Sequence, residues 1–319
     1  MLNKPFDPHL LKKTVCDGCG AADGTFLFEG PDRLTGLPGV FRLVSCAQCG
    51  LIRQDPCLQW DSLKDYYPEN YISYAPLISQ VPSWWKRLDR RYGMKKRVRA
   101  IKRVRATGNL LEVGCGTGIF LEEASRSNCW SLVGIEPNEK AAHYARTHLE
   151  LPIHQGLFSE FSLPPDHFDI ITLWNVLEHM DKPFREIRHA HDLLKKGGWL
   201  VFSIPNLESL GASLFGSYWL GYDLPRHLYL FPKKTLKHLL EGIGFNLVDI
   251  RCLAGSHAAY SLSLEFWSQD WPKHLFPLRP IFLKSFNSMV VRLGLGPFIW
   301  LIDWLLLSCN VTIFAQKKG

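Results

Sequence analysis

The sequence predicts an α/β fold in which a parallel sheet follows a small cysteine-rich domain. Three observations indicate it: strand-like and helix-like segments alternate from residue 109 onward, closely spaced glycines join the first strand to the first helix, and two C-x-x-C-G turns lie near the N-terminus. The 319 residues suffice for about two domains of ordinary size, and a content of 46% hydrophobic and 21% charged residues is that of a globular protein.

The positive charge is concentrated in one segment. Lys and Arg total 37 against 30 for Asp and Glu, which gives a net charge of +7. That excess is too small to indicate a nucleic-acid-binding protein as a whole. Eleven basic residues and one acid, Asp89, lie between Lys86 and Arg105, so the rest of the chain is slightly acidic.

The N-terminus and the cysteines indicate the compartment. The residues before Cys16 contain no apolar run of the length that a signal peptide requires, so we expect no secretion by that route. Nine cysteines, four of them in two tight pairs, do not form the pattern of a disulfide framework. We therefore expect a cytoplasmic protein with reduced thiols.

Residues 14–57 carry the pattern of a zinc ribbon. Cys16 and Cys19 form one C-x-x-C-G turn, and Cys46 and Cys49 form the other, with 26 residues between the two turns. Each turn brings two thiolates toward one ion, the following glycine permits the backbone of the turn, and two turns complete a four-cysteine site. Four protein ligands leave no place for water, so the expected zinc ion is structural. Redox-active or free thiols are the alternative.

A basic helix is expected between the cysteine-rich part and the sheet. Apolar residues recur at roughly helical spacing from Trp84 to Val104, which predicts an amphipathic helix with a crowded cationic face. Its three interpretations are docking on an anionic membrane, attraction of a phosphorylated substrate, and a solvated bridge between domains. We divide the chain into residues 1–80, 81–108 and 109–319, the first part ending in a segment rich in proline and tyrosine (Tyr66, Tyr67, Tyr71, Tyr74).

Alternating segments after residue 109 supply the sheet and the helices that cover it. The expected strands are Leu110–Val113, Ser131–Ile135, Phe168–Leu173, Trp199–Ile204, Phe245–Cys252 and Asn310–Ala315. The expected helices are Gly118–Ser127, Glu139–Thr147, Pro183–Leu194 and Lys233–Gly242.

Residues 255–309 interrupt this rhythm and are crowded with Trp and Phe, so we interpret them as an insertion before the closing strand. The tail at 297–307 has about half of the roughly 20 apolar residues that span a bilayer, and Asp303 interrupts it, so we expect no membrane crossing. The insertion is either a lid over an apolar or lipid-linked acceptor, lying on a membrane beside the basic helix, or a packed helical subdomain or dimer contact.

The turn between the first strand and the first helix has the features of a nucleotide site. Gly114, Gly116 and Gly118 allow bare backbone to approach a ligand, and the helix behind them supplies oriented N–H groups. Glu136 ends the next expected strand, where a carboxylate can accept both hydroxyls of an adenosine ribose. A dinucleotide fingerprint requires a third glycine where Ile119 stands, so the spacing disfavours NAD.

Residues 109–319 resemble a class I S-adenosylmethionine-dependent methyltransferase. The resemblance rests on the glycine turn and on four further motifs: Leu173-Trp-Asn-Val-Leu-Glu-His179, Lys195-Lys-Gly-Gly198, Ile204-Pro-Asn206 and Pro225-Arg-His-Leu-Tyr229. With the preceding cysteine turns, the chain is similar to bacterial methyltransferases that carry an N-terminal zinc-binding domain and are often tied to glycan or natural-product assembly. The resemblance implies a Rossmann-like sheet of six parallel strands plus an antiparallel closing strand, and S-adenosylmethionine as cofactor.

The resemblance also implies which residues hold the cofactor. They are Glu112, Gly114, Cys115, Gly116, Gly118, Glu136, Pro137, Leu157, Phe158 and Asn175. Leu157 stands where many relatives place an Asp against the adenine amino group, so we expect an aromatic or backbone contact from Phe158 to replace it. Cys115 is expected to be a small packing residue rather than a nucleophile.

Three residues are candidates for catalysis by the same resemblance. His227 is the expected base, and a packing histidine that shapes its loop is the alternative. His179, after the fourth strand, either contacts the substrate or packs near the cofactor. Tyr229 is a candidate hydrogen-bond donor, and Arg226 beside it is a candidate clamp for an anion.

The expected reaction is methyl transfer to a small molecule, a sugar or a lipid-linked glycan, with a His base for a hydroxyl acceptor. The first alternative is an RNA-binding or RNA-modifying protein that uses the zinc ribbon and the basic helix. The segment from Leu173 to Leu177 lacks the D/N-P-P-Y/F pattern usual for methylation of a base amine, so nucleic acid is disfavoured. The second alternative, a NAD-dependent sugar enzyme, is opposed by Ile119.

Overall fold

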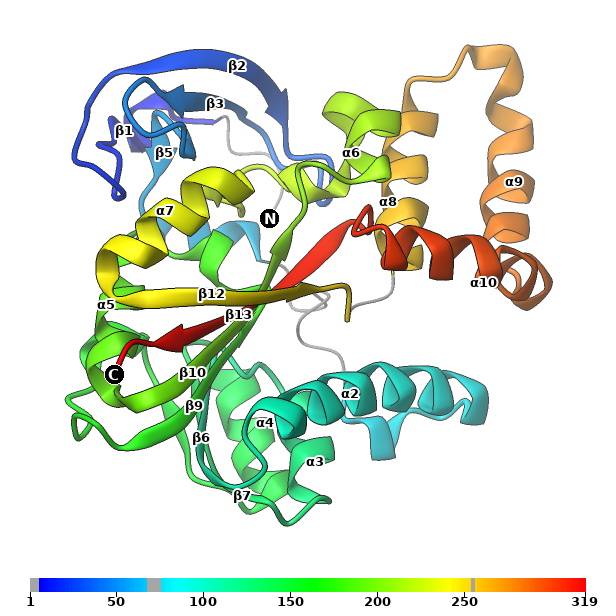
Figure 1. The fold of residues 1–319 in the computed structure, drawn as a ribbon. Helices are drawn as coiled ribbons and strands as arrows, with labels where there is room; N and C mark the ends of the chain where they lie inside the picture. The colour runs from blue at the N-terminus through cyan, green and yellow to red at the C-terminus, as the bar shows by residue number, and fades with distance from the viewer. Residues whose placement is uncertain (1–5, 68–75, 254–255) are drawn as a thin grey trace. The chain divides into compact units, whose positions relative to one another are not determined.

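The computed structural model divides the chain into two compact units, whose elements are labelled in Figure 1. It describes residues 6–67, 76–253 and 256–319, apart from the side chains of Met289 and Leu293. We call Met1–Tyr67, Ile204–Thr235 and Ala254–Val311 the ribbon unit, and Pro68–Ser203, Leu236–Leu253 and Thr312–Gly319 the sheet unit.

The boundaries expected at residues 80 and 108 follow changes in sequence character, and they stay a prediction. Tyr71 and Tyr74 of the tyrosine-rich segment, and Gly255 at the start of the expected insertion, lie outside the described residues.

Seven strands form the sheet, in the order β12-β13-β10-β9-β6-β7-β8. They are β6 (Gly108–Val113), β7 (Trp130–Glu136), β8 (Ile153–Gln155), β9 (Phe168–Trp174), β10 (Leu194–Pro205), β12 (Phe245–Arg251) and β13 (Asn310–Lys317). The neighbouring pairs from β10 through β9, β6 and β7 to β8 are parallel, and β13 runs antiparallel to β12. The mostly parallel sheet and the α/β fold class predicted from the sequence are confirmed.

The six strands whose ranges were expected are present, and the seventh strand that the resemblance implies is β8, for which no range was predicted. β6 and β9 read as nearly continuous apolar runs because helices cover both faces of a parallel sheet, and their central residues are buried. β8 has three residues, of which Ile153 alone is buried, so it lacks the pattern that marks a strand in the sequence.

Helices cover the two faces of the sheet. They are α2 (Trp84–Val104), α3 (Ile119–Ser125), α4 (Glu139–Leu149), α5 (Pro183–Leu193) and α7 (Lys233–Ile243). Val98 and Ile101 of α2 share one core with Phe120 of α3, Ala145 of α4 and strand residues such as Leu110. Figure 1 shows α5 on the other side of the sheet from α3 and α4.

The basic helix forms over nearly the expected residues and packs through its C-terminal half. Val98, Ala100 and Ile101 are buried, whereas Trp84 is 64% exposed and Tyr92 is similarly exposed. Trp84, Leu88 and Tyr92 of its first half therefore face solvent in the described structure, whereas Trp85 is half-buried.

A four-stranded antiparallel sheet organises the ribbon unit, in the order β11-β4-β3-β2. Its strands are β2 (Gly24–Pro31), β3 (Val40–Cys46), β4 (Ile52–Gln54) and β11 (Tyr229–Leu230), and a separate pair joins β1 (Leu11–Lys12) to β5 (Cys57–Leu58). In β11, Tyr229 lies opposite Arg53 and Leu230 lies opposite Ile52. The predicted ribbon thus takes its fourth strand from a segment distant in the sequence.

The remaining helices of the ribbon unit are α1 (Trp60–Leu63), α6 (Leu210–Phe215), α8 (His257–Gln269), α9 (Arg279–Phe286) and α10 (Met289–Trp304). The expected insertion is helical and lies between β12 and β13 in the chain. Every helix in the described ranges falls short of the length and apolar character that crossing a bilayer requires.

Candidate cofactor and metal sites

Three glycines with left-handed backbone shape the turn between β6 and α3. The φ angle is 67° at Gly114, 55° at Gly116 and 84° at Gly118. A Cβ added at Gly114 would lie 2.6 Å from a methyl group of Val176, and one at Gly118 would overlap Leu149. Backbone conformation and packing both favour glycine here, so the turn presents bare backbone at the carboxyl ends of the strands, where α/β sheets bind ligands.

Glu136 ties the ends of β6 and β7 together. Its Oε2 accepts a hydrogen bond from the backbone N–H of Gly116 at 2.7 Å, and its Oε1 accepts one from Asn138 at 2.8 Å. Burial raises the pKa of this carboxyl, and the two N–H groups oppose the rise. Each carboxylate oxygen can accept a second hydrogen bond, so Glu136 retains the capacity to receive hydroxyl donors. Pro137 follows it at the start of the turn into α4.

Glu112 is a buried carboxylate near the end of β6. Its Oε2 has no hydrogen-bond partner among the residues that the structure describes. Burial raises the pKa of Glu112 well above its ordinary value, the nearby Arg97 guanidinium opposes the rise, and the Glu136 carboxylate adds to it. An unused oxygen on a buried carboxylate is costly, which indicates a position shaped for a donor that the protein itself does not supply.

Arg97 extends this site from the basic helix α2. Its guanidinium lies 4.5 Å from the centre of the Trp174 ring, and burial lowers its pKa to about 10 while Glu112 opposes the fall. Arg97 was not predicted as a site residue because it is one of eleven basic residues in its segment. The sequence does distinguish Arg97 in one way: on a helix it lies on the same face as Met94 and Ile101, where a packed helix is expected to carry an apolar residue.

The segment after β9 borders the glycine turn, since Val176 faces Gly114. Asn175 adopts a left-handed φ of 56°, and its Nδ2 donates to Glu178 Oε1 at 3.1 Å. His179 ends the short 3-10 helix Leu177–His179. The structure therefore brings Asn175 to the carboxyl end of the sheet with the turn, while its role toward a cofactor stays a prediction.

Leu157 and Phe158 follow β8, and a backbone hydrogen bond connects the residue before them to Glu136. The N–H of Gly156 donates to the Glu136 carbonyl at 3.1 Å. The N–H of Leu157 donates to Glu160 Oε2 at 2.7 Å, and the buried Phe158 ring packs 4.6 Å from the ring of His189. A contact of either residue with adenine stays a prediction.

Cys115 is buried within the glycine turn. Burial raises the pKa of its thiol well above the ordinary value, and the carboxylates of Glu112 and Glu136 add to the rise. A protonated thiol is a poor nucleophile, which agrees with the expected packing role.

The loop of residues 223–229, which carries His227, belongs to the ribbon unit. Gln54 Nε2 donates to the carbonyl oxygens of Pro225 at 2.8 Å and of His227 at 2.7 Å. His227 Nδ1 lies 2.8 Å from the carbonyl oxygen of Gly221. Burial lowers the pKa of His227, and Asp223 and that carbonyl oppose the fall. Tyr229 is also buried and lies in β11, a strand of the four-stranded sheet of the ribbon unit.

The prediction that Arg226 clamps a substrate anion is wrong. Its side chain is 0% exposed, and the guanidinium donates to Asp223 at 2.6 Å, to Asp32 at 2.7 Å and to the carbonyl of Tyr66 at 2.9 Å. The cation is thus engaged by two carboxylates of the protein and holds the loop to the ribbon.

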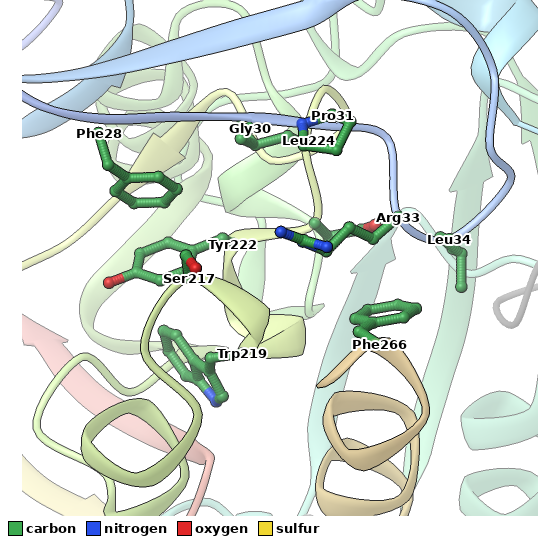
Figure 2. Close-up of a pocket in the computed structure, with 11 residues that line it drawn as sticks. Phe28, Gly30, Pro31, Arg33, Leu34, Ser217, Trp219, Tyr222, Leu224 and Phe266 are labelled. Carbon is green, nitrogen blue, oxygen red and sulfur yellow. The ribbon is translucent and has the colours of Figure 1, made fainter. Parts of the chain in front are cut away.

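A small pocket in the ribbon unit is shown in Figure 2. Phe28, Trp219, Tyr222 and Phe266 supply aromatic walls, and the guanidinium of Arg33 lines one side. None of the predicted cofactor or catalytic residues lines this pocket.

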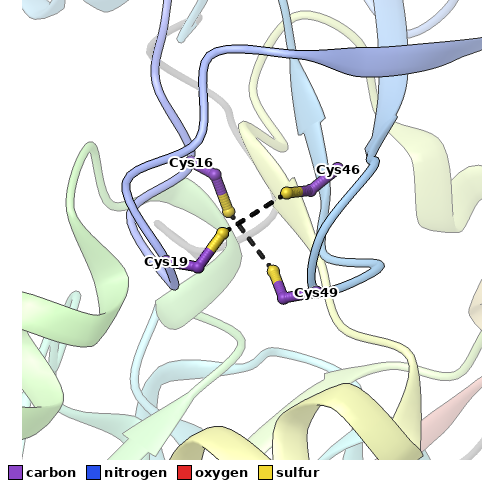
Figure 3. A group of neighbouring side chains, drawn as sticks. All are labelled: Cys16, Cys19, Cys46 and Cys49. Carbon is purple, nitrogen blue, oxygen red and sulfur yellow. Dashed lines mark hydrogen bonds between the residues drawn. The ribbon is translucent and has the colours of Figure 1, made fainter.

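The four predicted cysteines converge in the ribbon unit (Figure 3). Sγ atoms lie 3.5 Å apart for Cys16 and Cys49 and for Cys19 and Cys46, and all four lie within 4.8 Å of one another. The two turns match: Gly20 N donates to Cys16 O at 2.7 Å, and Gly50 N donates to Cys46 O at 3.0 Å.

This cluster fits a tetrahedral metal. With Zn–S bonds of about 2.3 Å, sulfur atoms around one zinc ion lie roughly 3.8 Å apart, close to the spacing present. Burial raises the pKa of Cys46, but the backbone N–H groups of Cys49 and Gln48 and the thiols of Cys19 and Cys16 together lower it to about 6, whereas burial raises the pKa values of Cys16 and Cys49. Such N–H groups favour the thiolate form that binds a metal.

Fold and sites together define an α/β protein with a nucleotide-type turn and a four-cysteine centre. Residues 84–250, just over half of the chain, match the family model described as a methyltransferase domain, and the chain belongs to that family.

The relatives it resembles include the ubiquinone biosynthesis O-methyltransferase of Nitrosospira multiformis, 30% identical over 39% of this chain and 55% of that protein. The enzyme of the same name from Aromatoleum aromaticum is 30% identical over 54% of this chain and 69% of that protein. The chain thus spans little more than half the length of the first of these relatives. A SAM-dependent methyltransferase of Archaeoglobus fulgidus, known from a crystal structure, is 20% identical with a TM-score of 0.47, over 74% of this chain and all of that one; this likeness is too low to add to the assignment.

Proposed function

We propose that the chain is an S-adenosylmethionine-dependent methyltransferase that acts on a hydroxyl group of a small molecule. One observation carries the proposal: the bare glycine turn, Glu136, and the pair of Glu112 and Arg97 gather in the sheet unit near the carboxyl ends of β6 and β7. Backbone N–H groups, a hydroxyl acceptor and partners for a zwitterion are the groups that an amino-acid nucleoside requires.

Each part of this cofactor has a candidate partner in the chain. The Arg97 guanidinium suits the methionine carboxylate, the unused oxygen of Glu112 suits the ammonium group, and Glu136 suits the ribose hydroxyls. When bound, S-adenosylmethionine supplies an electrophilic methyl group on its sulfonium. The protein's contribution is then to align the acceptor and to exclude water.

The acceptor is proposed from the relatives, which are named as O-methyltransferases. A hydroxyl must lose its proton as the new bond forms, and a neutral imidazole can take that proton. Donation of Nδ1–H to Gly221 assigns the proton of the neutral His227 ring to Nδ1 and its lone pair to Nε2. The lowered pKa keeps the ring neutral, so His227 is our proposed base, with His179 and Tyr229 as proposed substrate contacts.

We further propose that the four cysteines hold a structural zinc ion. All four ligands come from the protein, so the ion has no open position for a reacting group. The ion would stabilise a ribbon whose short strands bury little surface, and through Gln54 and Arg226 that ribbon holds the loop of His227. The sequence also led us to expect a sugar or a lipid-linked glycan as the methyl acceptor. We keep these larger acceptors as part of the proposed function.

The test is formation of S-adenosylhomocysteine with a panel of phenols, sugars and lipid-linked glycans. We expect turnover with a hydroxyl acceptor in the panel, and we expect His227→Gln to lose turnover while it binds the cofactor as the wild type does. Arg97→Met should instead weaken cofactor binding. A folded protein that binds no S-adenosylmethionine would overturn the proposed reaction class, and full activity of His227→Gln would remove the proposed base.

A further inference from the structure

Helices α9 and α10 present an apolar surface that the described part of the chain leaves exposed. No residue of α9 is buried, and Ile302 alone is buried among the described side chains of α10. Trp300 and Trp304 are 68% and 69% exposed. A helix of this apolar character ordinarily buries one face, so the surface is suited to an external partner.

The exposed residues of α10 lie on one side of the helix. At about 100° per residue, Phe298, Trp300, Leu301 and Trp304 fall within an arc of about 160°. Ile302 lies outside this arc. On α9, Ile281 and Phe282 are also exposed. Each helix therefore carries more than one exposed aromatic or aliphatic side chain.

The charge around this surface is positive. Residues 271–309 contain four basic residues and one acid, Asp303, and one of the four, Arg279, pairs with Glu265 of α8 at 3.9 Å. Asp303 accepts a hydrogen bond from Ser308 Oγ at 2.7 Å, whereas Lys273 and Lys284 are exposed. A second copy of the chain, docked through the same face, would bring these like charges together. Anionic headgroups would neutralise them, and Trp favours the interfacial region of a bilayer.

We infer that α9 and α10 dock on the surface of an anionic lipid bilayer. The aromatic side chains of α10 enter the headgroup region, and Lys273 and Lys284 meet the anionic headgroups. The helices lie along the interface, because 16 residues of α10 are too few to span the hydrocarbon core. This inference deepens the expectation of membrane contact and does not rest on methyl transfer, since lipid binding and cofactor binding are measured separately.

The test is flotation of the full chain with vesicles of phosphatidylcholine that contain phosphatidylglycerol, compared with vesicles of phosphatidylcholine alone. We expect binding to the anionic vesicles, weaker binding at high salt, and little binding to the neutral ones. The double variant W300Q/W304Q should bind at least about tenfold more weakly, because two exposed indoles no longer enter the interface. K273E/K284E should lose the preference for anionic vesicles.

Trp84→Gln is the matched control, because Trp84 is similarly exposed but lies on α2. It should bind vesicles as the wild type does, and all variants should keep the wild-type thermal unfolding and cofactor affinity. Absence of vesicle binding by the wild type would overturn the inference. So would a loss confined to Trp84→Gln, which would move the docking surface to α2. An oligomer that W300Q/W304Q dissociates, with no vesicle binding, would identify the face as a contact between copies.

Discussion

Neutralising Asp32 should destabilise the ribbon unit more than neutralising any exposed charged side chain does. The Asp32 and Arg226 side chains are both 0% exposed, and Asp223 supplies the second carboxylate. Removing one partner of a buried ion pair costs about 3 to 5 kcal/mol. We expect Asp32→Asn to lower the free energy of unfolding by about 3 kcal/mol, at the lower end of this range, because Asp223 continues to balance the Arg226 charge.

Urea unfolding of the zinc-loaded chain, followed by metal release to a chromogenic chelator, would measure this loss. With a slope of about 3 kcal/mol per molar urea, the midpoint should fall by about 1 M. Asp61→Asn is the matched control, because its carboxylate is 95% exposed and its pairing with Lys64 is worth less than about 1 kcal/mol. Equal midpoints for Asp32→Asn and the wild type would refute the argument that this buried cluster holds the loop to the ribbon.

Four further predictions concern the metal, the glycine turn and the proposed base. Cys46→Ser should lower bound zinc from one ion per chain to well below one, measured by atomic absorption; an unchanged content would exclude a four-cysteine site. Gly118→Ala should abolish cofactor binding or destabilise the sheet unit by about 1 kcal/mol or more, because a Cβ there meets Leu149 in a left-handed backbone, and wild-type binding and melting would contradict this. Burial lowers the pKa of His227 below 6.5, so the base should stay active into mildly acidic solution, and kcat/KM of the wild type should fall only below that pH. Because the unfolded state then binds the extra proton, His227 should also contribute stability that is lost as the pH falls below 6.5, which unfolding of His227→Gln against pH would check.

Local patterns in the sequence predicted the parts of the fold that short-range physics determines. β6 and β9 are buried on both faces, so their apolar runs stand out, and the two C-x-x-C-G turns require no distant partner to be recognised. No range was predicted for β8, because a strand of three residues with one buried side chain resembles a loop in the sequence.

The features that the sequence did not reveal depend on distant partners. Asp223 stands three residues before Arg226, but Asp32 lies 194 positions away, so the local sequence does not show that the guanidinium is buried between two carboxylates. β11 pairs with β4 across a similar distance, and this pairing attaches the loop of His227 to the ribbon. Arg97 differs from its basic neighbours only in the face of α2 that it occupies, which becomes meaningful once Glu112 and Trp174 are in place.

The central claim is that the glycine turn, Glu136 and the pair of Glu112 and Arg97 bind S-adenosylmethionine, and calorimetric titration of the full chain tests it most directly. We predict one site per chain, with affinity reduced about tenfold or more in Glu136→Ala and in Arg97→Met, because each removes a hydrogen bond to a charged group. Arg87→Met, a change on the same helix outside the packed half, should bind as the wild type does. No binding by the wild-type protein, or equal affinity in all variants, would contradict the account.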